Sequence, residues 1–394
     1  MKNRTVGAFI AGIATATLVV IVTSAGAIGY NNAKANQAGV NAQVALPYKT
    51  PGPNASRGGF VSAKSTVTTC TTVIGDHRLG YYLTGNADVT ADAAVIGNLE
   101  GLTQYRSLAD GSTFPGWNKA WINNLGPEVK RNYVLELKHY GAAAGPQTVG
   151  GVVVPAPNMT IQQRPGTTWP KAYGYDQVTS GAIDPLLDRA LDQLKVMPYN
   201  NTVNIQLASE FDTDHEFGTT EAGVTYTWTQ SDARAIQALK YITDYFDANG
   251  LPEGVTLSIG MGGFDRAAFK RMHPADIEDR FQVLQWNAYN HGTNRTPLQV
   301  FSRTWDWAVE DLKGTYWLNK PIMIAEWGIA SSLGSQAAWI DGVDEAITEL
   351  NERPGPDISD ANYFNANPAW ATLNPKQSGL EALGRVANSA PFND

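Results

Sequence analysis

The feature that most constrains the fold of this chain is an alternation of short apolar runs with helical patterns, repeated eight times from about residue 65 onward. Each apolar run is short enough to be a strand that is buried on both faces. The eight expected strands are residues 79–83, 102–108, 133–137, 203–207, 257–260, 281–289, 322–325 and 358–364. Strands that alternate with helices form a parallel sheet. Eight such units over roughly 320 residues predict an α/β fold, the (β/α)₈ TIM barrel.

Apolar residues at helical spacing fill the segments between these strands. The expected helices are residues 91–96, 183–195, 232–248, 300–318, 337–350 and 379–388. Ser231 is expected to cap the third of them, and Gly250 lies just past its end. The segment 142–179 is rich in Gly, Pro, Gln and Thr and is too long for an ordinary connection. We therefore expect it to be a functional excursion on the active face.

The N-terminal part has a different composition. Residues 1–30 begin with positive charge and continue as an apolar, Ala-rich run through Ala25-Gly26-Ala27, the pattern of a signal peptide or of a retained membrane anchor. Residues 31–64 are rich in Asn, Ala, Gln, Pro and Gly, which predicts a flexible linker. We expect residues 65–394 to be the barrel domain, outside the cell or at its surface, with membrane contact only through the N-terminal segment.

Charge and composition narrow the partners. The chain has 29 Lys and Arg against 37 Asp and Glu, a net charge of −8, and no basic run, which argues against nucleic acid. Cys70 is the only cysteine, so an intrachain disulfide cannot form. The 11 Trp and 16 Tyr supply flat apolar rings with a polar group, which suit stacking on sugars. Oligomeric state is not predicted.

Two expected strands lead into a glutamate. The segment 320–328 runs from apolar residues into Glu326, and the segment 204–210 runs into Glu210. The carboxyl ends of barrel strands open on one face, where barrel enzymes carry their chemistry. Glycoside hydrolysis needs two carboxyl groups that flank one bond; in the retaining form they lie about 5–5.5 Å apart, one as nucleophile and one as proton shuttle. The two glutamates are therefore a candidate catalytic pair.

The segment 320–328 also resembles the nucleophile strand of glycoside hydrolase family 26, the family that contains β-mannanases. The resemblance runs from the third expected strand to the C-terminus and includes residues 360–365, Trp370 and residues 380–391. It implies a (β/α)₈ barrel in which Glu326 is the nucleophile and Glu210 the general acid and base.

Further site residues are implied by the same resemblance. Tyr289 matches a tyrosine that donates a hydrogen bond to the nucleophile, and His139 matches a histidine that lines the sugar subsite. Trp286 and Trp327 are expected to form the floor of the subsite by ring stacking. The alternatives are a tyrosine of the barrel wall, a structural histidine and tryptophans of the core.

The chain departs from the family pattern beside Glu210. The family usually has His directly before the acid and Asn two residues after it, whereas this chain has Ser209 and Asp212. Glu216, preceded by His215, is the alternative acid if the fourth strand ends later. We favour Glu210, because the strand pattern stops there. The departure leaves the substrate preference open.

The acidic cluster after Glu210 and a glycine-rich run complete the candidates. Asp212, Asp214, His215 and Glu216 are dense but lack the spacing of metal ligands, so we expect a solvated loop and no metal. The run 260–263 lacks the helix and lysine of a phosphate loop, and we expect it to let the backbone approach a substrate.

The predicted function is a retaining endo-β-glycosidase that needs no cofactor and hydrolyses a β-linked polysaccharide, mannan-like or a related glucan or xylan. The alternative is a non-catalytic carbohydrate-binding or surface structural protein on the same barrel. A barrel hydrolase of an unrelated bond type is a third and weaker prediction.

Overall fold

In the computed structural model, the parts of the chain that are described are residues 78–83, 90–107, 129–136, 147–149, 152–154, 174–181, 183–197, 203–213, 216–221, 224–229, 231–291, 294–365 and 376–392. The predicted signal or anchor (1–30) and linker (31–64) lie outside them. No helix within the described ranges is long and apolar enough to cross a membrane.

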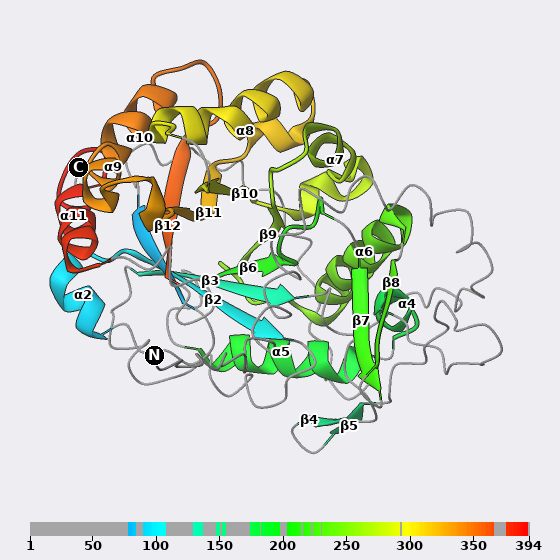
Figure 1. Ribbon diagram of the computed structural model, residues 1–394. Helices are drawn as coiled ribbons and strands as arrows, with labels where there is room; N and C mark the ends of the chain where they lie inside the picture. The colour runs from blue at the N-terminus through cyan, green and yellow to red at the C-terminus, as the bar shows by residue number, and fades with distance from the viewer. Residues whose placement is uncertain are drawn as a thin grey trace, which may run out of the picture. The chain divides into compact units, whose positions relative to one another are not determined.

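Within these residues, eight parallel strands close into a barrel (Figure 1). They are β1 (Arg78–Leu83), β2 (Gly101–Ser107), β3 (Lys130–Glu136), β6 (Val203–Leu207), β9 (Thr256–Met261), β10 (Val283–Asn290), β11 (Ile322–Ile329) and β12 (Ile358–Asn365). The first strand, β1, pairs with both β2 and β12, which closes the ring. The predicted (β/α)₈ barrel is confirmed, and each barrel strand overlaps an expected one.

Helices surround the barrel (Figure 1). They are α2 (Thr90–Ile96), α4 (Gly174–Thr179), α5 (Asp184–Val196), α6 (Asp232–Asn249), α7 (Arg266–Arg271), α8 (Pro297–Asp311), α9 (Gln336–Ile340), α10 (Val343–Asn351) and α11 (Gln377–Ala387), with the short 3₁₀ helices η5 (Ala275–Arg280), η6 (Tyr316–Asn319) and η7 (Ser331–Leu333). The Ser231 hydroxyl accepts a hydrogen bond from the Arg234 N–H at the start of α6, and Gly250 ends that helix in the left-handed conformation, as predicted.

Two expected helices are divided. The predicted helix 300–318 ends as α8 at Asp311, because Gly314 adopts a φ of 81° that a helix cannot continue through, and η6 follows separately. The predicted helix 337–350 breaks between α9 and α10 at Gly342, a poor helix former.

Two antiparallel hairpins lie between barrel strands and the helices that follow them. One joins β4 (Gln147–Val149) to β5 (Val152–Val154), and the other joins β7 (Glu216–Glu221) to β8 (Val224–Thr229). Each is inserted after the carboxyl end of a strand, β3 and β6 respectively. The predicted excursion 142–179 thus contains the β4-β5 hairpin and α4; its role stays a prediction.

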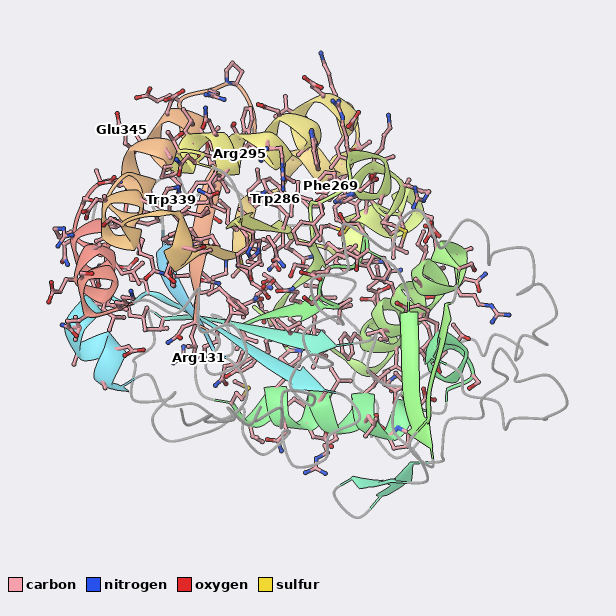
Figure 2. All side chains as sticks on the ribbon, in the orientation of Figure 1. Arg131, Phe269, Trp286, Arg295, Trp339 and Glu345 are labelled. Atoms are coloured by element: carbon pink, nitrogen blue, oxygen red, sulfur yellow. The ribbon has the colours of Figure 1, made fainter. Side chains whose placement is uncertain are left out.

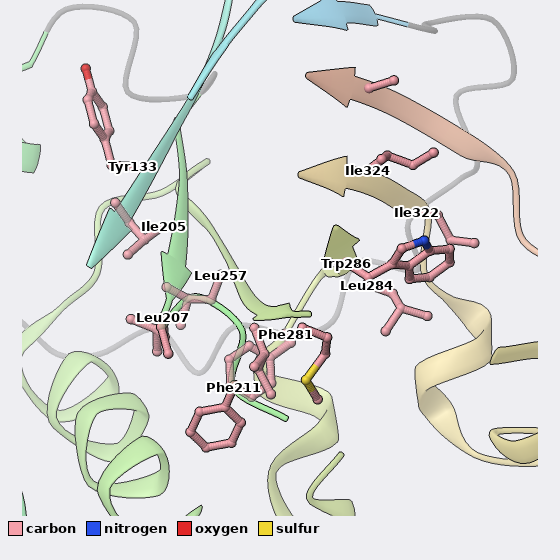
Figure 3. Packing of buried hydrophobic residues seen from close by; sticks show 14 of the residues in the cluster. Tyr133, Ile205, Leu207, Phe211, Leu257, Phe281, Leu284, Trp286, Ile322 and Ile324 are labelled. Carbon is pink, nitrogen blue, oxygen red and sulfur yellow. The ribbon is translucent and has the colours of Figure 1, made fainter. Parts of the chain in front are cut away.

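The apolar core lies between the strands and the helices. Trp286, Leu284 and Ile322 pack closely together in this layer (Figure 3). The Trp286 ring also meets Phe269 of α7 edge to face, with ring centres 6.1 Å apart, and both labelled side chains lie on the helix side of the strands (Figure 2).

The interior of the barrel, by contrast, is filled with buried amides. Asn132 of β3 is the hub: its amide donates to Gln206 Oε1 at 2.8 Å, and its oxygen accepts from Asn204 at 2.6 Å and from Gln285 at 3.4 Å. These side chains alternate along each strand with apolar residues that face the helices, such as Ile205 between two of them. A barrel interior is more often filled by branched aliphatic side chains. Here hydrogen bonds join the buried amides to one another instead, although Gln285 Oε1 accepts none from the described residues.

A buried histidine makes the fold sensitive to acid. The His273 ring is fully enclosed, its Nδ1 contacts the Phe269 carbonyl at 2.5 Å, and no described residue bonds its Nε2. Desolvation lowers the pKa of His273 from 6.5 to about 4. Between pH 6.5 and pH 4 the unfolded chain therefore binds one more proton than the folded chain. The contribution of His273 to the free energy of unfolding is fully present above pH 6.5 and is lost as the pH falls toward 4.

We expect the free energy of unfolding to fall by about 3 kcal/mol between pH 6.5 and pH 4 because of His273. Denaturant unfolding of the wild type and of His273→Gln at pH 7 and pH 4 checks this, because the substitution should remove that part of the pH dependence. An equal change in the free energy of unfolding between pH 7 and pH 4 in the two proteins would refute the role of His273.

Candidate active site

The turn that follows β6 carries Glu210. The strand ends at Leu207, and Ala208 and Glu210 adopt φ values of 70° and 48°. The N–H of Phe211 donates to the Gly260 carbonyl at 2.9 Å, and the Phe211 ring is buried in the core. The turn therefore leaves the barrel strand at once and presents Glu210, which is half-buried, at the carboxyl end of the barrel.

Glu326 reaches the same end of the barrel from inside β11 rather than from its end. The strand continues to Ile329, past the predicted end at residue 325. Pairing with β10 runs Trp286 to Ile324 and then Asn287 to Glu326, so β11 carries one extra residue at this point. A bulge of this kind reverses which residues face inward. Because of it, Glu326 turns into the barrel while Ile324 packs in the core.

One side chain contacts both carboxylates. The Asn287 amide donates to Glu210 Oε1 at 3.4 Å and to Glu326 Oε2 at 3.2 Å. Two oxygens bonded to one nitrogen can be no farther apart than the sum of these distances, 6.6 Å. The fold thus brings together two glutamates that lie 116 positions apart along the chain.

Tyr289 also contacts Glu326. Its hydroxyl donates a short hydrogen bond to Glu326 Oε2, the oxygen that Asn287 also contacts. The Tyr289 ring lies edge to face against Phe364 of β12, with centres 5.5 Å apart, and 4.9 Å from the His291 ring. Two donors on one carboxylate oxygen favour its ionised form.

Trp286 and Trp327 lie in the apolar core and not in the candidate site. Trp286 and Trp327 are both fully buried on the helix side of their strands. Trp327 packs against Phe301 and Tyr363, with ring centres 6.0 Å and 4.8 Å away. Neither ring can be the floor of a sugar subsite, so this expectation is corrected: alternation along each strand turns them away from the inward-facing Asn287 and Glu326.

Of the other predicted site residues, His139, His215 and Glu216, the structure describes only the backbone of Glu216. His139 and His215 lie outside the described residues. Glu216 begins β7, opposite Thr229 in a hairpin outside the barrel sheet, and its side chain is not described. Because β6 ends at Leu207, the later strand end on which the Glu216 alternative rested does not occur.

Asp212 and the glycine-rich run turn out to contact each other. The buried Asp212 carboxylate accepts hydrogen bonds from the N–H groups of Gly262 and Gly263. The solvated loop predicted for the acidic cluster is therefore wrong at Asp212. The expected approach of the glycines to a substrate is replaced, at these two N–H groups, by a contact within the protein.

Sequence reasoning missed Asn287 and Phe364. Both belong to segments that had been singled out, but an asparagine and a phenylalanine in a strand carry no signal of their own. Only the inward register of β10 and β12 identifies them.

The chain was compared with known proteins. No protein-family model and no curated protein matches the sequence. Among solved structures, a family 26 β-mannanase from Bacteroides ovatus is similar, with a TM-score of 0.53, 12% identity, and coverage of 79% of this chain and 89% of that one. This chain has a (β/α)₈ barrel fold similar to that of family 26.

A second family 26 structure supports the same conclusion about the fold. A modular endo-β-1,4-mannanase from Cellulomonas fimi has a TM-score of 0.51 and 13% identity, over 81% of this chain and 72% of that one. The resemblance found in the sequence is thus confirmed as a likeness to the family 26 fold.

Proposed function

We propose that this chain is a glycoside hydrolase that cleaves a β-linked polysaccharide by double displacement, with Glu326 as nucleophile and Glu210 as general acid and base. The observation that carries the proposal is the shared Asn287 amide, which limits the separation of the two carboxylate oxygens to 6.6 Å. Retaining glycosidases hold these groups about 5–5.5 Å apart and inverting ones about 6.5–9.5 Å apart. The limit allows the retaining separation and reaches only the lower edge of the inverting range, and the stereochemistry of the product decides between the two.

The surroundings of each carboxylate support its role. Glu326 is buried and receives hydrogen bonds from Tyr289 and Asn287, which hold it ionised and fix its direction of attack. Glu210 is more exposed and lies on a turn, where it can protonate the leaving oxygen and then deprotonate water. Bond cleavage by this route uses only these side chains and water.

Mannan is the first substrate to test, because the similar structures are a β-mannanase and an endo-β-1,4-mannanase. Such polymers are found outside the cell, which agrees with the proposal that residues 1–30 direct export of the chain. The purified full chain should release reducing ends from mannan or from a related β-glucan or xylan. Proton NMR of the first product should show a β-anomer. Binding without new reducing ends on any polymer would favour a carbohydrate-binding protein.

Tyr289→Phe should lower kcat by about 10- to 100-fold, the loss of one hydrogen bond to a charged group. Tyr241→Phe is the matched control: its hydroxyl donates to Asp184 at 2.7 Å, away from the site. Equal losses of activity in both variants would contradict the role of Tyr289.

A further inference from the structure

The turn that carries Glu210, residues 208–213, is under backbone strain. Ala208 and Glu210 both adopt left-handed φ values, which non-glycine residues rarely take. Such a conformation persists only where the surroundings hold it. The Glu210 turn therefore needs contacts that fix its shape.

The first half of this turn is held through the backbone of Ala208, by one backbone carbonyl and by the side-chain amide of Gln206. The Ala208 N–H donates to the Leu135 carbonyl at 3.0 Å, and the Ala208 carbonyl accepts from the Gln206 amide at 3.1 Å. Gly260 leaves room for this arrangement, since a Cβ there would lie 1.9 Å from Gln206 Nε2. These contacts tie residue 208 to the barrel interior, but they do not reach beyond Glu210.

Asp212 holds the second half. Its Oδ1 accepts from the Gly262 N–H at 2.5 Å and its Oδ2 from the Gly263 N–H at 3.0 Å. The Gly263 carbonyl in turn accepts from Arg303 Nη2 at 2.9 Å. The carboxylate thereby connects the Glu210 turn, through the segment after β9, to α8.

We propose that Asp212 is a positioning residue that holds Glu210 where it can exchange a proton with the glycosidic oxygen. The inference rests on the proposed function. The two N–H groups approach different oxygens, Oδ1 and Oδ2, which a carboxylate provides, whereas an asparagine side chain has one oxygen and one NH₂ group. The departure from the family pattern at this residue is thus explained: Asp212 secures both N–H groups, whereas Asn would place its own N–H₂ group against one of them.

The test compares Asp212→Asn with the wild type on two aryl glycosides of one sugar. We expect kcat/KM to fall about 10- to 100-fold for the phenyl glycoside, whose leaving group needs a proton, and to stay within about twofold for the dinitrophenyl glycoside, whose leaving group does not. Equal losses on both substrates, or no loss on either, would overturn the proposal.

Asp265→Asn is the matched control. Its carboxylate also accepts from a backbone N–H, that of Ala268 at 2.8 Å, but this hydrogen bond caps α7 and does not hold the Glu210 turn. We expect it to lower thermal stability without the dependence on leaving group. If Asp212→Asn does not fold, Asp212→Ser, which keeps one acceptor, replaces it with the same expected pattern.

A second readout separates this inference from the proposed function. If the wild type hydrolyses no glycoside, the proposed function fails. The surroundings of the Glu210 carboxyl can still be followed by carbon-13 NMR, with Glu210→Gln to assign its signal. A change in the chemical shift of this signal in Asp212→Asn, with no change in Asp265→Asn, would support the positioning role of Asp212. An unchanged signal in Asp212→Asn would overturn it.

Discussion

Glu326→Ala is expected to lower kcat on the polysaccharide by about 10⁴-fold or more while the barrel stays folded, because the variant has no group to attack the anomeric carbon. The substitution removes the Glu326 oxygen that accepts from the Tyr289 hydroxyl and one of the two acceptors of the Asn287 amide, but it also removes a buried charge. We therefore expect a modest change in the unfolding temperature, measured by circular dichroism beside the rate of sugar release.

Azide gives this prediction a chemical signature. In Glu326→Ala, azide can occupy the space of the carboxylate and attack an activated β-glycoside from the nucleophile's side, so the product should be the α-glycosyl azide. Glu310→Ala, a change at an exposed glutamate of α8, is the matched control and should keep full activity. Wild-type rates in Glu326→Ala would remove the residue from the mechanism.

Glu210→Ala is expected to have the second largest effect, a loss of about 10²- to 10⁴-fold on the polysaccharide, which is the usual contribution of a general acid and base. For a dinitrophenyl glycoside, kcat/KM should stay near that of the wild type, because the leaving group needs no proton. Hydrolysis of the glycosyl enzyme then becomes slow, since no base activates water.

Azide separates the two glutamates. It should raise the rate of Glu210→Ala and give the β-glycosyl azide, since it intercepts the intermediate from the face that water would use. Glu216→Ala is the informative comparison. If that variant shows the leaving-group pattern and Glu210→Ala does not, the proton shuttle is Glu216, and the assignment of Glu210 is wrong.

The pattern of apolar runs is enough to predict the barrel, because a strand that is buried on both faces can be recognised from a few consecutive residues. In β6 the run from Val203 to Leu207 is bounded as predicted. The break between α9 and α10 at Gly342 was missed, since a single glycine is often tolerated in a helical pattern.

Which face of a strand a residue occupies was much harder to predict. The extra residue in β11 turns Glu326 inward, and this bulge is visible only in the pairing with β10. Trp286 was expected beside the sugar because it lies next to site residues in the sequence, yet alternation places it in the core. The contact of Asp212 with residues 262 and 263 joins segments about 50 positions apart and has no local signature.

The most direct measurement is covalent trapping with a 2-deoxy-2-fluoroglycosyl fluoride of the sugar that the substrate panel identifies. The fluorine at C2 slows both displacements, and the fluoride leaving group lets the first one proceed, so the glycosyl enzyme accumulates. Peptide mass spectrometry should find one fluorosugar bound to the Glu326 carboxylate. A label on another residue, or an inverted product with no labelled protein, would contradict the account.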